Sequence, residues 1–348
     1  MTKNKSKKRK NKTKTLILLL FLTIVMLATS TYAWFTANKT VKISNIDVNV
    51  AAASGIQIST DASVWKTLIT TTDISEGYTV GSYTDKNQLP GSMVPVSTPG
   101  TATSGYLNFY KGTVEANETT GLYELSAEAC DPEAKSTTNG DFIAFDIFLR
   151  LDTASDVYLE NGSGVIVKEG TTDKGLQYAS RMAFVTEGHG ATLASQTDLV
   201  SPNTASQIII LEPNYDGHNG YGVQQAKTYY TKYTYASGIA NLVAGTGNGA
   251  ITYDAIKAEI ASTDPIELSL TNATDKSTYF QTMSNVQKTT TAFSNADEGE
   301  ENLLLYTAMP AGVTKIRVYM WIEGQDVDCE NNASGSDLTF NLSFTLIP

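Results

Sequence analysis

The stretch from Leu338 to Leu346 alternates apolar and small polar residues without exception. Alternation with a period of two places one set of side chains on a single face of a β-strand. Residues 314–322 also alternate, with Ile, Val, Met and Ile in one phase and Arg, Tyr and Trp in the other. Residues 141–153 carry a wholly apolar face opposite a mixed face that includes Asp146. Such strands need a second layer to cover their apolar faces, so the chain is constrained to packed β-sheets.

Turn-forming residues separate the strand-like stretches along the whole chain. Clusters of glycine, proline, asparagine and serine occupy residues 89–95, 161–164 and 214–222, and such clusters end helices and favour turns. One short helix is predicted over residues 254–260, with Thr252 as its N-cap. We therefore predict an all-β fold, a jelly-roll-like β-sandwich with one or two small helices and long loops.

The first strand is predicted over residues 39–50. Its alternation changes phase at residues 44–45, which indicates a bulge or kink within one long strand. Small residues follow at 51–55, and residues 56–60 resume an alternating apolar pattern. These two strands are predicted to form an N-terminal hairpin.

The N-terminal segment has the composition of an export signal. Eight basic residues and no acidic one precede an apolar run from Leu16 to Ala28. This order predicts a helical signal peptide over residues 1–33, with cleavage between Ala33 and Trp34. The alternative is an uncleaved anchor, in which residues 15–35 are just long enough to span a membrane. In both cases residues 34–348 leave the cytoplasm, as one large β-sandwich domain.

The junction between this segment and the domain carries a family resemblance. It reads T-Y-A-W-F-T from Thr31 to Thr36 and resembles the T-(W/Y)-A-x-F-(S/T/N) junction of the camelysin and biofilm-matrix-fibre family of Gram-positive bacteria. The resemblance covers the signal peptide and first strand, and beyond them only a β-rich, acidic character. It implies cleavage after Ala33 by a dedicated signal peptidase, a mature chain beginning at Trp34, and secretion to the extracellular space or cell surface.

Net charge excludes one class of partner. Removing residues 1–33 takes away eight basic residues and changes the formal net charge from −11 to −19 (−11 minus 8). A strongly acidic surface repels the phosphates of nucleic acids, so no nucleic-acid binding is expected. Contact with a membrane is expected only through residues 15–35, if they remain uncleaved.

No catalytic motif is recognisable in the sequence. Members of the camelysin family have been classed as metallopeptidases, but neither His189 nor His218 lies in an H-E-x-x-H motif. A G-x-S-x-G serine elbow is absent, and neither cysteine has a basic neighbour that would activate its thiol. We therefore predict that the chain is not an enzyme.

Two weaker site predictions concern cysteines and acids. Outside the cytoplasm Cys130 and Cys329 could form one disulfide, or they could remain two unrelated thiols. Asp326, Asp328 and Glu330 alternate in a loop and could supply oxygen ligands to calcium, or they could form a solvated acidic loop. No other cofactor is expected.

These observations predict a secreted structural subunit of an extracellular surface or biofilm-matrix fibre, a homopolymer. Its assembly is predicted to use an N-terminal donor strand, which a neighbouring subunit would add to its own sheet. The donor side chains would be Val41, Ile43, Ile46, Val48 and Val50. The alternative is a secreted or anchored adhesin domain that binds glycans or proteins, and a third class is a secreted hydrolase.

Overall fold

The structure is a computed structural model of the whole chain. It describes residues 48–52, 55–117, 119, 123–134, 139–160, 163–190, 205–213, 254–267, 277–284, 286–288, 302–326, 328–329 and 335–346. The predicted signal peptide and the first part of the predicted donor strand lie outside these residues. Among the described residues, no helix has the length and apolar character needed to cross a membrane.

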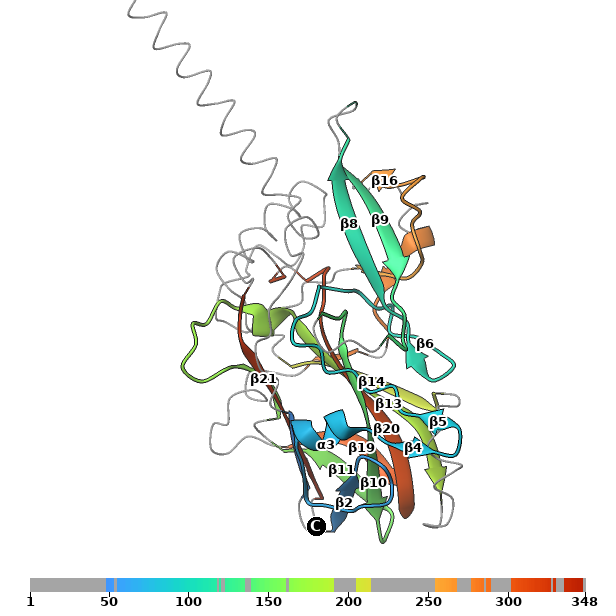
Figure 1. The fold of residues 1–348 in the computed structure, drawn as a ribbon, viewed down its shortest axis with the longest axis vertical. Helices are drawn as coiled ribbons and strands as arrows, with labels where there is room; N and C mark the ends of the chain where they lie inside the picture. The colour runs from blue at the N-terminus through green and yellow to red at the C-terminus, as the bar shows by residue number, and fades with distance from the viewer. Residues whose placement is uncertain are drawn as a thin grey trace, which may run out of the picture.

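Two six-stranded sheets dominate the fold (Figure 1). We call the first the β20 sheet; its order is β18-β14-β13-β20-β10-β2, made of Val286–Lys288, Gln207–Glu212, Ser180–Gly190, Gly312–Ile322, Ile143–Leu151 and Ile56–Ser59. The second, the β21 sheet, has the order β19-β11-β21-β1-β3, with β12 also along β21. Its strands are Leu303–Met309, Ser155–Leu159, Leu338–Thr345, Val48–Ala52, Leu68–Ile69 and, for β12, Gly164–Val167.

The main core lies between these two sheets. It contains alternate residues of β10, β13 and β20 on one side and of β11, β19 and β21 on the other. Two aromatic pairs join the layers edge to face: Phe145 contacts Phe340 with ring centroids 6.4 Å apart, and Phe184 contacts Phe344 at 6.2 Å. The period-two alternation therefore predicted the facing core correctly.

The opposite face of the β20 sheet is buried as well. The segment 78–110 crosses it and pairs at isolated bridges, Gln88 with Ala144 and Val96 with Glu323. An aromatic group fills the space beneath, in which Phe109 stacks on Phe142 at 4.5 Å and meets Trp321 edge-on at 5.2 Å. The β20 sheet is thus an internal layer, which explains why its central strands are buried on both faces.

Smaller elements surround the sandwich. The hairpin β8 (Tyr110–Ala116) and β9 (Tyr123–Ala129) extends away from the two sheets and carries the short strand β16 (Ile266–Glu267) (Figure 1). Short paired strands complete the set: β4 (Thr79–Val80) with β5 (Tyr83–Thr84), β6 (Ala102–Thr103) with β7 (Tyr106–Leu107), and β15 (Asp254–Ile256) with β17 (Phe280–Thr282). Helical elements among the described residues include α3 (Thr71–Glu76) and η1 (Leu176–Ala179).

Two local predictions are wrong. Residues 254–260 do not form a helix: they begin with strand β15, and Ile260 forms a bridge with Ala127. Ala255 and Ile256 are fully buried, and the Ile256 amide donates to Ser97 Oγ at 3.0 Å. Tertiary partners thus override the local helical pattern.

The predicted N-terminal hairpin is the second error. β1 and β2 join different sheets: β1 pairs parallel with β21 and antiparallel with β3, whereas β2 pairs with β10. Gly55, in the connection between β1 and β2, has a φ of +98°. Glycine adopts this positive φ readily, whereas residues with a side chain rarely do. The all-β prediction is confirmed, but the parallel β1–β21 pair leaves the jelly-roll topology unconfirmed.

Candidate functional site

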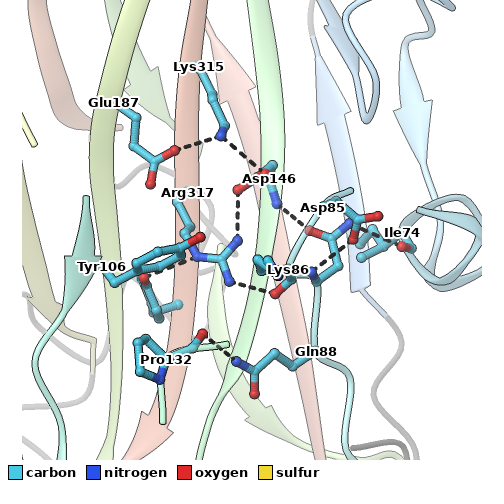
Figure 2. A network of polar contacts seen from close by, with 12 residues as sticks. Ile74, Asp85, Lys86, Gln88, Tyr106, Pro132, Asp146, Glu187, Lys315 and Arg317 are labelled. Atoms are coloured by element: carbon cyan, nitrogen blue, oxygen red, sulfur yellow. Dashed lines mark hydrogen bonds and ion pairs between the residues drawn. The ribbon is translucent and has the colours of Figure 1, made fainter. Parts of the chain in front are cut away.

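Four charged side chains meet on the outer face of the β20 sheet, away from the main core. They come from its three central strands: Asp146 from β10, Glu187 from β13, and Lys315 and Arg317 from β20. Figure 2 shows Lys315 between Glu187 and Asp146, and Arg317 directed toward Asp146 and Lys86. All four side chains are at most 1% exposed. We refer to these four residues as the charged cluster.

Strand register explains how the four residues meet. Asp146 lies directly opposite Arg317 in the β10–β20 ladder. On the other side of β20, the ladder with β13 shifts between Thr186 and Gly188, so that Gly188 lies opposite Lys315. Glu187 therefore occupies a β-bulge, a feature that re-aims a side chain relative to a regular ladder. Here the bulge brings the Glu187 carboxyl to the Lys315 ammonium.

The cluster is held together by close ion pairs. Lys315 Nζ lies 2.7 Å from Glu187 Oε2 and 3.3 Å from Asp146 Oδ2. Arg317 Nη1 lies 2.9 Å from Asp146 Oδ1. The Lys315–Glu187 contact is an ion pair, and apart from it neither Glu187 oxygen has a hydrogen-bond partner among the described residues.

The covering segment completes the site with polar and aromatic groups. The Tyr78 hydroxyl donates to Asp146 Oδ2 at 2.7 Å, and Arg317 Nη2 donates to the Lys86 carbonyl at 2.6 Å. The Tyr83 ring centroid lies 5.5 Å from Lys315 Nζ. The Tyr106 ring lies 5.3 Å from the Arg317 guanidinium carbon. Aromatic faces attract such cations most strongly where water is excluded.

The two carboxyl groups of the cluster have pKa values shifted in opposite directions. Burial disfavours ionisation of Asp146, but Lys315, Arg317 and the Tyr78 hydrogen bond outweigh it and lower the Asp146 pKa. Burial and the charge of Asp146 raise the pKa of Glu187 to about 7, against the opposing effect of Lys315 and Arg317. Asp146 is thus held as an anion, whereas Glu187 readily takes up a proton.

A second buried polar group lies at another part of the same face. Arg181 Nη2 lies 2.9 Å from Glu212 Oε1 and also pairs with Asp326. Nearby, Trp321 Nε1 donates to Glu323 Oε2 at 3.0 Å. Burial raises the pKa of Glu323 to about 7, although Trp321, Ser97, Arg181 and the Gln325 amide oppose it.

Of the two alternatives for the cysteines, the structure has two separate thiols. Cys130 and Cys329 are both buried and are not bridged. Cys329 belongs to the core between the two sheets, whereas Cys130 belongs to the apolar group on the outer face of the β20 sheet. They pack in different layers, which their sequence positions did not reveal. Burial raises the pKa of the Cys130 thiol above its ordinary value.

The predicted calcium ligands do not assemble in the described part of the chain. Asp326 accepts from Arg181 and from the Asp328 amide, and both aspartates are buried. Glu330 lies outside the described residues. Within those residues, no group of three or more histidine, cysteine, aspartate or glutamate side chains is arranged to hold a metal ion.

The remaining predicted sites belong to the N-terminus. Ala33, Trp34, Val41, Ile43 and Ile46 lie outside the described residues. Val48 and Val50 are in β1, where their backbones lie opposite Phe340 and Leu342 of the chain's own β21. The donor segment thus overlaps a strand that the subunit uses in its own sheet.

The charged cluster was not predicted from the sequence. Its signal was present: Asp146, Lys315 and Arg317 interrupt the two strongest strand patterns, each at positions that a buried face would fill with apolar residues. Charged residues are almost never fully buried unless paired. Their partner Glu187 gave no signal, because its position depends on a bulge that the sequence pattern does not reveal.

A surface groove of about 410 Å³ lies beside the β8–β9 hairpin. Its lining includes Tyr106, Tyr110, Cys130 and Glu133. The Tyr106 hydroxyl is 3.4 Å from Glu133 Oε1, which places an acid and two aromatic rings along one depression. Such a combination suits a neutral polar ligand.

Chemically, the charged cluster can hold and move protons between an amine and two carboxyl groups that water does not reach. In the resting site Asp146 is an anion that can accept a proton, and Glu187 is a carboxyl group whose charge varies near neutral pH. Lys315 lies between them and contacts both.

No model of a protein family, no curated protein and no solved structure matches this chain.

Proposed function

We propose that this protein is a secreted structural subunit of an extracellular surface or biofilm-matrix fibre, a homopolymer whose subunits exchange their N-terminal strands. The observation that carries this proposal is the position of β1. It lies inside the β21 sheet, between the eight-residue strand β21 and the two-residue strand β3. Its pairing with β21 extends over five residue pairs, from Val48 opposite Phe340 to Ala52 opposite Phe344.

The connection after β1 supports exchange. Only residues 53–55 separate β1 from β2, yet the two strands lie in opposite sheets. If these residues extend instead of crossing, β1 and everything before it can pair with the β21 of a neighbouring subunit. An exchanged strand makes the same contacts as its own strand would, so swapping costs little once the hinge opens.

Such a contact is head-to-tail. Each subunit gives one strand and receives one, so the chain of subunits continues unless its rotation closes a ring. Main-chain hydrogen bonds supply affinity, and the alternate side chains supply register. The segment predicted to be freed by cleavage after Ala33 would then extend the exchanged strand along β21.

The test uses the exported chain beginning at Trp34, verified by N-terminal sequencing. Electron microscopy should show fibres of this chain and only monomers of a variant that lacks residues 34–44. The deletion removes Lys39 and Lys42, so a K39Q/K42Q variant of full length is the matched charge control and should still form fibres.

A second experiment adds a peptide of residues 34–52 to the intact chain. The peptide should stop fibre growth by occupying the place of β1 beside β21. Polymerisation of the deletion variant, or an intact chain that stays monomeric, would contradict the proposal.

A second candidate is an adhesin domain that binds glycans or proteins, with the groove at Tyr106, Tyr110 and Glu133 as its site. Aromatic faces stack on sugar rings, and a nearby carboxylate accepts from hydroxyl groups. In a glycan-array measurement, Y110A should lose binding that V64A retains, because Val64 is exposed and does not line the groove. Equal binding by both variants would remove this candidate.

A further inference from the structure

Lys315 is placed between two carboxyl groups in a site closed to water. Its Nζ lies 2.7 Å from Glu187 and 3.3 Å from Asp146. These three side chains come from three adjacent strands, β13, β20 and β10. The Tyr83 ring covers Lys315, and Tyr78 donates to Asp146. An amine held against a carboxyl group in this way reacts as if at a very high local concentration.

The two carboxyl groups have unequal surroundings. Asp146 contacts Lys315, Arg317 and the Tyr78 hydroxyl. Glu187 has the single ion-pair contact with Lys315, and its Oε1 lacks a hydrogen-bond partner among the described residues. A carboxylate resists attack by an amine, whereas a protonated carboxyl group is electrophilic. Glu187 is therefore the reactive acid, and Asp146 is the base.

We propose that Lys315 and Glu187 join in an intramolecular isopeptide bond between β20 and β13, with Asp146 as the catalytic residue that carries the proton. The bulge at Glu187 serves this purpose, because it brings the side chain to the lysine of the neighbouring strand. This inference is independent of the proposed fibre function.

The reaction balances without any additional reagent. Asp146 takes one proton from the Lys315 ammonium, and the resulting amine attacks Cδ of the protonated Glu187 carboxyl group. A C–N bond forms, the C–OH bond breaks, and the hydroxyl leaves with a second proton from the nitrogen as water. Asp146 then releases its proton. One ammonium and one carboxylic acid thus give one amide, one water and one proton, and exclusion of water from the site prevents the reverse hydrolysis.

Mass spectrometry of the exported full-length mature chain tests this proposal. Under denaturing conditions its mass should be lower than the sequence predicts by one water molecule. A proteolytic digest should contain a branched peptide that joins Glu187 to Lys315, and trypsin should no longer cut after Lys315. A mass equal to that of the sequence would overturn the proposal. So would water loss that maps elsewhere, including a bond from Lys315 to Asp146.

Variants identify the role of each residue. K315R and E187A should each restore the full sequence mass, while D146N should lower the cross-linked fraction at a given time after synthesis. The matched control is K111R, because Lys111 also faces an acid on a neighbouring strand, 3.9 Å from Glu128, but both side chains are exposed, 40% and 74%. K111R should keep the water loss. If a variant fails to fold, the peptide map of the unaltered chain still decides the question.

Discussion

At the scale of the residue, burial in the folded chain changes how tightly an acidic side chain holds its proton. Glu323 is fully buried and receives hydrogen bonds from the Trp321 indole and the Gln325 amide. Ser97 and the Arg181 guanidinium also favour its ionised form, yet burial dominates and raises its pKa. An acid of this kind binds its proton more tightly in the folded chain than in the unfolded chain.

The first prediction follows from this difference. The pKa of Glu323 rises from 4.5 to about 7 on folding, so its contribution to stability is complete below pH 4.5 and is lost as the pH rises through 7. The loss amounts to about 3 kcal/mol, because one pKa unit corresponds to about 1.4 kcal/mol. Urea unfolding at a series of pH values should show this decrease in the free energy of unfolding.

The control is E323Q, which has no proton to lose. Its free energy of unfolding should fall less than that of the unaltered chain over the same pH range. The pKa of Glu187 is raised to a similar value. Glu187 therefore adds the same pH dependence to the stability of both proteins, unless its carboxyl group has reacted in the proposed isopeptide bond. Identical pH profiles for the two proteins would contradict the assignment to Glu323.

Residue-scale prediction from the sequence succeeded for apolar side chains and failed for charged ones. Alternation places Ile316, Val318 and Met320 in the core, and they are there. The same alternation places Arg317 on the opposite face but does not say that this face is covered. Its cover, residues 78–110, has few periodic features, so the burial of the charged cluster depends on tertiary packing that the pattern does not contain.

At the scale of the element, α3 illustrates a helix too short for periodicity to reveal. It has six residues and buries only Ile74. Its start is fixed by a capping box: Thr70 accepts from the Asp73 amide, and Asp73 accepts from the Thr70 amide. Lys66 also pairs with Asp73. Capping chemistry, rather than an apolar stripe, specifies this helix.

The second prediction tests that cap. T70A removes the side-chain acceptor at the helix start and should lower the free energy of unfolding by about 1 kcal/mol. T72A, inside the first turn and on an exposed position, is the matched control and should change stability by less than about 0.5 kcal/mol. Chemical denaturation measures both, and equal effects would show that the cap does not stabilise the fold.

Strands were easier to predict than their partners. β10, β20 and β21 lie close to where alternation placed them, because a period of two reports directly on a pleated strand with distinct faces. The helix predicted over residues 254–260 and the hairpin over residues 39–60 failed for one reason. Both depended on neighbours in the sequence, whereas β15 pairs with β17 and β1 pairs with β21, far along the chain.

At the scale of the whole molecule, the fold is a three-layer arrangement. The β21 sheet, the β20 sheet and the covering segment 78–110 enclose two apolar layers. The charged cluster lies between the β20 sheet and the covering segment. Strand β1 lies in the β21 sheet, between β21 and β3. A bond between Lys315 and Glu187 would lock the central sheet, while an exchangeable β1 would leave the other sheet able to join a neighbour.

The third prediction concerns how charge controls assembly. If the chain is cleaved after Ala33 as proposed, each subunit carries a formal net charge of −19 (−11 minus the eight basic residues of the segment 1–33). Repulsion between such subunits opposes fibre growth and is screened over about 10 Å at 0.1 M salt and about 3 Å at 1 M. The initial rate of fibre growth, measured by light scattering with electron microscopy as a check, should therefore rise with sodium chloride concentration.

Calcium separates two causes of this dependence. At equal ionic strength, calcium chloride and sodium chloride should both accelerate growth through screening, and a further increase in calcium alone would indicate that acidic groups bind the ion between subunits. The variant that lacks residues 34–44 should stay monomeric in both salts, because screening cannot replace the missing residues that extend the exchanged strand. Growth that slows as the sodium chloride concentration rises, or that does not respond to it, would contradict this prediction. It would mean that repulsion between the acidic subunits does not limit the rate at which they exchange strands.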